Sequence, residues 1–306
     1  MVLINDLSAD AKINVAKRPT LERIAHEGGM GRARFKELYD MFYIHGPGNG
    51  TFLGLPFDQL VEHGIGHTLK WERSADTRAV IELANRGNFS ALALSIGQAE
   101  KYQNLIKPDL PLIIKVDGHF LVGKDVPYPR HSTLSSVERA LEAGANAIGI
   151  TFYIGGEETE RDAERVSEIT EVAHKNGKPV FMWAYARGPL PEKMGADSLY
   201  WCAQGGSAAE SIGVDVVKQK FPAFVKGDKF KVYEENLRKD GYLGKNMPEV
   251  EELLKLEDRA FVGDNLYVRR LAYMNSVAPN LLKIISGGPK SEDEKGLTRT
   301  LKYVMD

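Results

Sequence analysis

Two lysines, Lys218 and Lys220, lie two residues apart in the apolar run 214–220. In an extended strand such residues point to the same side, which they share here with Val214 and Val216. Burial and repulsion between two ammonium groups both favour the neutral amine. A neutral amine can attack a ketone and form a Schiff base. The spacing therefore indicates a nucleophilic lysine, although a phosphate-binding pair or a salt-bridged structural lysine would fit it as well.

Polar residues also follow other apolar runs of the sequence. Asp58 follows the first run, Tyr153 ends the fourth, and Ser286, Gly287 and Gly288 end the seventh. A carboxylate or a phenol at such a position can bind hydroxyl groups or transfer protons. The backbone N–H groups of a glycine-rich turn can bind a phosphate. The structural alternatives are a turn cap for Asp58, aromatic packing for Tyr153 and an ordinary turn for the Ser-Gly-Gly sequence.

The strand-like runs alternate with segments of helical periodicity, which is typical of βα units around a parallel sheet. Seven such runs are recognisable, at residues 51–57, 91–94, 111–116, 147–153, 179–185, 214–220 and 281–286. Helices are expected over residues 76–86, 163–177, 266–274 and 297–304. A further helix is expected to begin at a capping box formed by Ser135 and Glu138. The sequence predicts an α/β fold, a TIM-type (β/α)8 barrel whose eighth strand is missing at the C-terminus, apparently through truncation. We expect residues 1–50 to form a helical capping segment and 51–306 the barrel.

The carboxyl ends of the strands form the active-site face of such a barrel. Besides the residues named above, this face should carry Lys115, Trp183, Arg187 and Lys220, which we expect to contact the substrate or its phosphates.

Composition narrows the functional classes further. The 306 residues include 40 basic and 42 acidic side chains, for a net charge of −2, and no basic stripe predicts nucleic-acid or membrane binding. A single cysteine fits a cytoplasmic protein. The sequence contains neither a signal pattern nor an apolar run long enough to cross a membrane.

No metal site is expected. Glu62, His63, His67 and His119 are irregularly spaced, and no His-Glu-x-x-His pattern occurs.

Five motifs, in order, make the sequence resemble the archaeal-type class I fructose-bisphosphate aldolases, which are also found in bacteria. These motifs are Leu55–Gly64, Thr151–Glu158, Trp183–Arg187, Gly213–Lys220 and Ile285–Gly288. The resemblance covers residues 50–306 and implies reversible cleavage of fructose 1,6-bisphosphate to dihydroxyacetone phosphate and glyceraldehyde 3-phosphate. It implies no cofactor, because a protonated imine replaces the metal as electron sink.

The same resemblance implies individual roles. Lys218 would form the Schiff base, Tyr153 would act as general acid and base in carbon–carbon cleavage, and Asp58 would bind hydroxyls and assist proton transfer. Ser286, Gly287 and Gly288 would hold a phosphate, and the protein would form a homo-oligomer, commonly built from pentameric rings. Leu60 departs from the family's usual glycine, and the second phosphate-binding turn after strand eight is absent.

Two alternatives remain at this point. The first is a related Schiff-base barrel, either a transaldolase-like synthase of an aromatic precursor or a thiolase acting on a phosphorylated signal. The second is a non-catalytic barrel that binds sugar phosphates. The Val-Lys-Gln-Lys sequence and Glu157-Glu158 favour the aldolase over the first alternative, and the retained Lys218, Tyr153 and Asp58 argue against the second.

Overall fold

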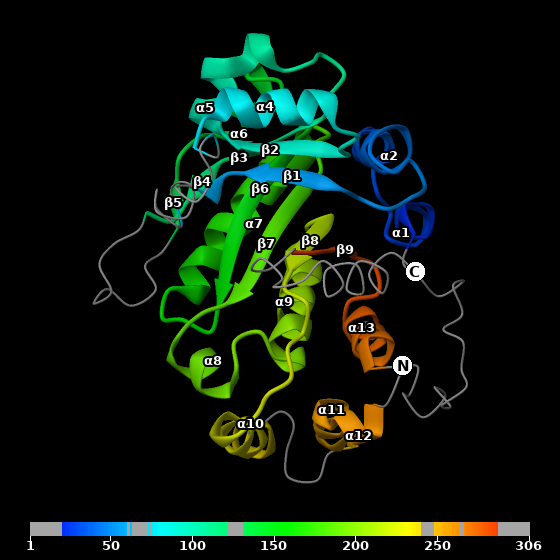
Figure 1. The fold of residues 1–306 in the computed structure, drawn as a ribbon, viewed down its shortest axis with the longest axis vertical. Coiled ribbons are helices and arrows are strands. Elements are labelled where there is room, and N and C mark those ends of the chain that lie inside the picture. Colours follow the sequence, from blue (N-terminus) through cyan, green and yellow to red (C-terminus); the bar gives the residue numbers. More distant parts are fainter. Residues whose placement is uncertain are drawn as a thin grey trace.

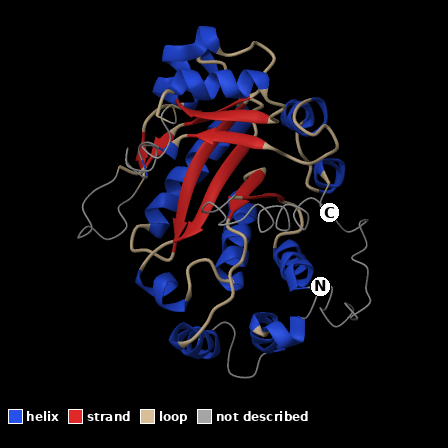
Figure 2. Ribbon diagram, viewed as in Figure 1, coloured by secondary structure: helices blue, strands red, loops and turns tan. Residues whose placement is uncertain are grey.

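The computed structural model describes residues 20–59, 62, 73, 75–120, 131–239, 248–262 and 266–286. Among these residues a curved sheet of seven parallel strands forms the centre of the molecule (Figures 1 and 2). In spatial order the strands are β1 (Gly54–Phe57), β2 (Ala91–Ser95), β3 (Leu112–Lys115), β6 (Ala147–Ile154), β7 (Val180–Ala186), β8 (Val216–Gln219) and β9 (Leu282–Ile285).

This sheet confirms the predicted TIM-type architecture with seven recognisable strands. Every neighbouring pair is parallel, from β1 with β2 to β8 with β9. The described residues form no ladder between β1 and β9, so these strands are the two edges of the sheet. The curvature brings the carboxyl ends of the central strands toward a common mouth.

Helices between the strands cover the outer face of the sheet (Figure 1). They are α4 (Thr77–Arg86), α5 (Ile96–Tyr102), η5 (Gln103–Leu105), α6 (Val137–Glu142), α7 (Thr159–Lys175), α8 (Pro189–Met194), α9 (Leu199–Ile212) and α13 (Leu266–Val277). The connection from β8 to α13 adds α10 (Asp228–Lys239), α11 (Pro248–Glu257) and α12 (Arg259–Val262). A two-stranded antiparallel ladder, β4 (Asp117–Gly118) with β5 (Ser132–Thr133), follows β3.

Side chains alternate between two separate cores along each strand. On β7, Phe181 and Trp183 belong to an inner cluster, whereas Val180 and Met182 pack in the outer cluster with the helices. This is the period-2 pattern of a strand that is buried on both faces. Trp183 fits inside because Gly149, on the neighbouring β6, has no side chain: a Cβ there would lie 3.1 Å from the indole.

The first described helices close the inner cluster at the amino ends of the strands. They are α1 (Leu21–Glu27), α2 (Arg32–Tyr39) and the π-helical turn η3 (Asp40–Ile44). Leu38, Met41 and Phe42 are buried against the inner residues at the start of the strands. The division of the chain at residue 50 stays a prediction.

Local capping differs in one place from the sequence expectation. The capping box predicted at Ser135 and Glu138 is wrong by one residue, because Ser136 is the N-cap of α6 and accepts a hydrogen bond from the Arg139 N–H. Ser135 instead donates its hydroxyl to the Ser136 carbonyl. The last helix, expected over 297–304, lies outside the described residues.

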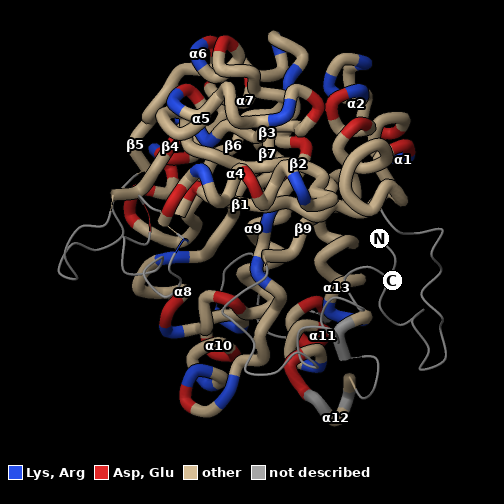
Figure 3. Tube along the Cα trace, turned by 45° about the horizontal axis from the view of Figure 1, so that its top comes forward, with Lys and Arg blue, Asp and Glu red and all other residues tan. Residues whose placement is uncertain are grey.

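Acidic and basic residues are interspersed over the peripheral helices, as Figure 3 shows for α2, α10 and α11. In the part of the chain that is described, no helix is long and apolar enough to cross a membrane.

Candidate active site

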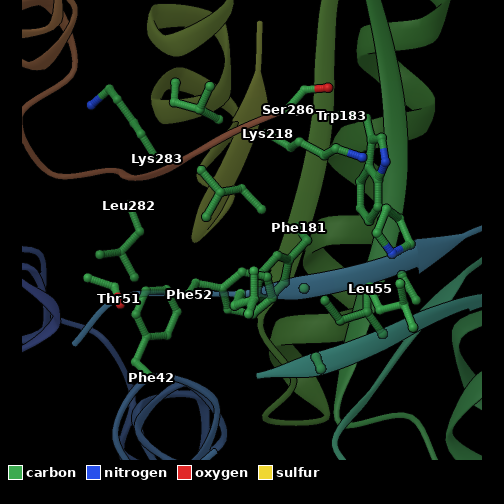
Figure 4. A pocket seen from close by; sticks show the side chains of 18 of the residues that line it. Phe42, Thr51, Phe52, Leu55, Phe181, Trp183, Lys218, Leu282, Lys283 and Ser286 are labelled. Atoms are coloured by element: carbon green, nitrogen blue, oxygen red, sulfur yellow. The ribbon is translucent and has the colours of Figure 1, made fainter. Parts of the chain in front are cut away.

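Lys218 lies on the inner side of β8, between Trp183 of β7 and Ile284 of β9 in the strand register. Val216 belongs to the inner cluster and Val217 to the outer one. The face of β8 that carries Lys218, which the sequence alone could not assign, is therefore the one that faces the barrel interior. The Lys218 amine lies 4.9 Å from the centre of the Trp183 ring, toward which it points in Figure 4.

The surroundings of Lys218 favour the neutral amine. Burial lowers the pKa of Lys218 below its ordinary value; Lys115 and Lys220 lower it too, while Asp58 and Glu62 oppose them. Repulsion from Lys115 outweighs that from Lys220, which the sequence spacing alone suggested as the charged neighbour. A lysine of this kind can act as a nucleophile near neutral pH.

Lys115, on β3, has the opposite character. Its side chain is 1% exposed, and its ammonium lies 3.3 Å from Asp117 and 3.6 Å from Asp58, with a shorter contact to Glu62. Burial alone would lower the pKa of Lys115, but the three carboxylates together raise it above the ordinary value. Lys115 therefore stays protonated and offers no free electron pair.

Asp58, directly after β1, is buried and contacts the Lys115 ammonium through Oδ2. Its Oδ1 is also buried, with no hydrogen-bond partner among the described residues. A buried carboxylate oxygen without a partner costs free energy unless a ligand or a water molecule supplies a donor. Asp58 is thus placed to accept a hydrogen bond from a bound hydroxyl.

A cavity of about 700 Å³ opens beside Lys218 and continues between β1 and β9 (Figure 4). Apolar inner residues line most of it, together with Trp183, Lys218 and Ser286. A mostly apolar cavity with a few convergent polar groups is the usual form of a small-molecule site.

Residues 52–305 match the family model described as DeoC/LacD family aldolase. The chain belongs to this aldolase family.

Individual relatives agree with this assignment. The chain is 28% identical to a probable class 1 fructose-bisphosphate aldolase of Chlamydia muridarum, over 68% of this chain and 61% of that protein. It is 30% identical to the class 1 fructose-bisphosphate aldolase of Halobacterium salinarum, over 57% of this chain and 65% of that protein. The chain thus spans less than two thirds of the length of either relative.

A solved structure has a similar fold. It is that of an archaeal fructose-1,6-bisphosphate aldolase whose catalytic lysine is covalently bound to the carbinolamine intermediate of its substrate. The TM-score is 0.65, at 22% identity, over 88% of this chain and 87% of that chain.

Two tyrosines stand side by side at the mouth of this aldolase-family barrel. Tyr153 on β6 and Tyr185 on β7 are register partners on the inner face, and the Arg187 guanidinium lies 5.6 and 5.4 Å from their ring centres. Burial raises the pKa of Tyr153 to about 12. Burial also raises the pKa of Tyr185, although a hydrogen bond with Ser286 lowers it in part.

Tyr185 was given no role by the sequence analysis. The signal that could have found it is the alternation on β7, where Trp183 and Tyr185 occupy consecutive inward positions, as Thr151 and Tyr153 do on β6. The sequence did not indicate the contact of Glu62 with Lys115 either.

Two further predicted residues, Ser286 and Lys220, follow β9 and β8. The Ser286 N–H donates to the Gln219 carbonyl over 2.7 Å, and Ser286 lines the cavity. Lys220 is half-buried and directly follows β8, two residues after Lys218. Gly287 and Gly288 lie outside the described residues, as do His63, His67 and Leu60. Among the described residues, no group of three or more His, Cys, Asp or Glu side chains is arranged to hold a metal ion.

A polar network extends from this mouth to the helix layer. Arg165 of α7 donates to Asp162 over 3.0 Å, to Asp117 over 2.8 Å and to the Thr151 carbonyl over 2.8 Å. Asp117 also accepts from the Thr151 N–H and contacts Lys115. Asp117, one of the three carboxylates around Lys115, is therefore held in position by the backbone of β6 and by α7.

Proposed function

We propose that this protein is a class I aldolase that reversibly cleaves fructose 1,6-bisphosphate into dihydroxyacetone phosphate and glyceraldehyde 3-phosphate through a Schiff base on Lys218. The observation that carries the proposal is the inward-facing Lys218 amine, whose pKa is lowered by burial, beside a cavity of the barrel interior. The family assignment and the names of the relatives support the reaction class.

The neighbouring lysines fit a nucleophilic role less well. The Lys115 ammonium is held by three carboxylates, so its nitrogen has no free electron pair. Lys220 is level with the mouth and half-buried, and a cation there suits a phosphate of the substrate. Both amines lie near the Trp183 ring. Its centre is 5.9 Å from the Lys115 amine and 4.9 Å from the Lys218 amine.

The proposed reaction begins with attack of the Lys218 amine on the C2 carbonyl. The carbinolamine loses water and becomes a protonated imine. The C3–C4 bond then breaks, its electron pair moves into the imine to give an enamine, and the C4 hydroxyl loses its proton as the aldehyde forms. Protonation at C3 and hydrolysis of the imine release dihydroxyacetone phosphate and restore the amine.

The groups around Lys218 have distinct proposed parts in these steps. Tyr153 serves proton transfer in carbon–carbon cleavage, and Asp58 binds hydroxyls through its unpartnered Oδ1. Tyr185, which shares surroundings with Asp58 and Ser286, assists loss of the carbinolamine hydroxyl. Ser286, with Gly287 and Gly288, binds one phosphate, and Arg187 and Lys220 neutralise charge at the mouth. A homo-oligomeric assembly and a cytoplasmic location stay predictions.

The decisive experiment is borohydride trapping with dihydroxyacetone phosphate, followed by peptide mass spectrometry. We expect one reduced adduct on Lys218 in the unmodified protein and none in Lys218→Met, while Lys220→Met retains it. An adduct on Lys115 or Lys220, or none at all, would overturn the proposal. A parallel assay of fructose bisphosphate cleavage and of the two related Schiff-base activities determines the substrate.

A further inference from the structure

The cavity beside Lys218 reaches into the apolar interior of the barrel. Lys218 lines this cavity, and so does Phe42, which packs with the inner residues at the amino ends of the strands. Neither Arg187 nor Tyr153 of the mouth is among the described residues that line it. Its volume of about 700 Å³ is that of an ordinary small-molecule site. A compound bound at Lys218 therefore has room on the interior side of the amine, apart from the polar groups of the mouth.

An aromatic wall runs along this cavity to Lys218. The ring centres of Phe42 and Phe52 are 5.4 Å apart, and those of Phe52 and Phe181 are 5.5 Å apart. Trp183 occupies the next inward position on β7, and its ring centre lies 4.9 Å from the Lys218 amine. All four rings line the cavity (Figure 4). Such a wall offers a large apolar surface, against which another aromatic group packs favourably.

Short and aliphatic side chains form much of the remaining lining. Ala91 and Ala93 of β2 and Leu282 and Ile284 of β9 all line the cavity and pack in the inner cluster. A phosphate in these surroundings would lose its hydration and meet mainly apolar atoms, which is costly. An uncharged apolar group, by contrast, gains free energy when such a surface removes it from water. The lining therefore favours an apolar group over the phosphorylated end of a sugar.

A second amine, that of Lys283, also lines the cavity. Its nitrogen donates to the carbonyls of Ala278 and Leu281, which follow α13. Burial lowers the pKa of Lys283 to about 8. This amine is held by the backbone, whereas the Lys218 amine lies over the Trp183 ring. A test of the cavity must nevertheless tell an adduct on Lys218 from one on Lys283.

We propose that Lys218 also forms a Schiff base with uncharged ketones and aldehydes whose apolar tail occupies this interior cavity. The Lys218 nitrogen attacks the carbonyl carbon, and the carbonyl oxygen leaves as water with the two hydrogens of the amine, so that a C=N bond replaces the C=O bond. The tail then lies along the aromatic wall. The inference rests on the proposed function only for the nucleophilic amine, and it gives the same nitrogen a second class of substrate.

Three carbonyl compounds separate the contribution of the tail from that of the amine. Acetone and 4-phenylbutan-2-one are both methyl ketones, but only the second has an aromatic tail. Dihydroxyacetone phosphate has a phosphate instead. Each compound is incubated over a range of concentrations with the full chain and cyanoborohydride, which converts the imine into a stable secondary amine. Peptide mass spectrometry then shows which lysine carries the adduct and how much of it has formed.

We expect 4-phenylbutan-2-one to label Lys218 with a half-saturating concentration about 10- to 100-fold below that of acetone, the ratio that burial of one aromatic group supplies. Equal half-saturating concentrations, or an adduct on Lys283 in place of Lys218, would overturn the inference. An adduct of dihydroxyacetone phosphate without this effect of the tail would overturn it while leaving the proposed function intact. Labelling of Lys218 by 4-phenylbutan-2-one alone would have the opposite meaning.

A variant that fills the cavity tests the position of the tail. Ala93→Leu adds three carbon atoms to an inward position of β2 without adding charge. We expect it to remove most of the preference for 4-phenylbutan-2-one over acetone and to keep the adduct of dihydroxyacetone phosphate on Lys218. The matched control is Ala260→Leu, which adds the same atoms to an exposed position on α12 and should keep the preference.

An unchanged preference in folded Ala93→Leu would place the tail outside the cavity and overturn the inference. If Ala93→Leu does not fold, the comparison of the two methyl ketones in the unmodified protein still decides the question, because it needs no variant.

Discussion

At the scale of single residues, two amines lie near one indole ring, and their pKa values are shifted in opposite directions. Lys115 has three carboxylate neighbours, whereas Lys218 is half-buried and has Lys115 itself among the nearby cations. The positive charge that the carboxylates hold on Lys115 lowers the pKa of Lys218 and so favours its neutral form. The residues that bind Lys115 therefore also influence the reactivity of Lys218.

The lowered pKa of Lys218 predicts how imine formation depends on pH. The neutral amine is the reactive form, so the initial rate of trapping should rise with pH, with a midpoint below the ordinary lysine value of 10.5. Removal of a neighbouring cation in Lys220→Met should move the midpoint to higher pH. A midpoint at or above 10.5 in the unmodified protein would contradict the assignment of Lys218.

Removal of the Lys115 ammonium should be strongly destabilising. In Lys115→Met the carboxylates of Asp58, Glu62 and Asp117 would be left buried without their common counter-charge. We expect the free energy of unfolding in urea to fall by about 3–5 kcal/mol, as for other broken buried ion pairs. Lys101→Met, which changes an exposed lysine on α5, is the control and should alter stability little.

At the scale of elements, the parallel pairing of β6 with β7 places two phenols at the same level of the mouth. Tyr185 contacts Ser286, which lines the cavity of Lys218, whereas Tyr153 packs against His131. The two strands thus present one phenol to the side of Ser286 and the other to the side of His131.

These positions predict different effects of the same substitution. Tyr153→Phe should retain trapping on Lys218 and lower cleavage by about 100-fold, the scale of a lost acid or base. Tyr185→Phe should slow trapping itself, because loss of the carbinolamine hydroxyl lacks a proton donor. Rapid-quench trapping and steady-state cleavage separate the two steps, and identical behaviour of both variants would contradict this division.

The strands could be predicted from the sequence because each is an apolar run bounded by turn residues. All seven runs correspond to the strands β1, β2, β3, β6, β7, β8 and β9, and Asp76 and Gly87 bound α4 as the helix signals indicated. The Ser136 cap was missed because two adjacent serines offer equivalent hydroxyls. Two of the carboxylates around Lys115, Asp58 and Glu62, come from a segment more than 50 residues earlier in the chain, and no local pattern indicates such a contact.

At the scale of the whole molecule, the long connection from β8 to α13 is fixed by one buried ion pair. Arg270 of α13 and Glu257 of α11 are fully buried and lie 3.1 Å apart. Arg270 also donates to the carbonyls of Leu256 and Ala223, and Glu257 accepts from the Val225 N–H. The pair thus joins three separate segments outside the catalytic mouth.

Replacement of this arginine should affect stability and leave the chemistry intact. Arg270→Met leaves Glu257 buried without its counter-charge, and we expect a loss of about 3–5 kcal/mol in unfolding free energy. The fraction that remains folded should keep the pH midpoint of trapping on Lys218. A shifted midpoint would mean that this peripheral connection acts on the site.

The two edges of the sheet have a consequence for how protection against hydrogen exchange is distributed. The central strands β6 and β7 are paired on both sides, whereas β1 and β9 are each paired on one side among the described residues. Amide protons should therefore exchange slowly in the centre and faster toward both edges. Lys218 lies on β8, directly beside the edge strand β9. A local opening of β9 would therefore reach the strand of Lys218 before it reached the central strands β6 and β7.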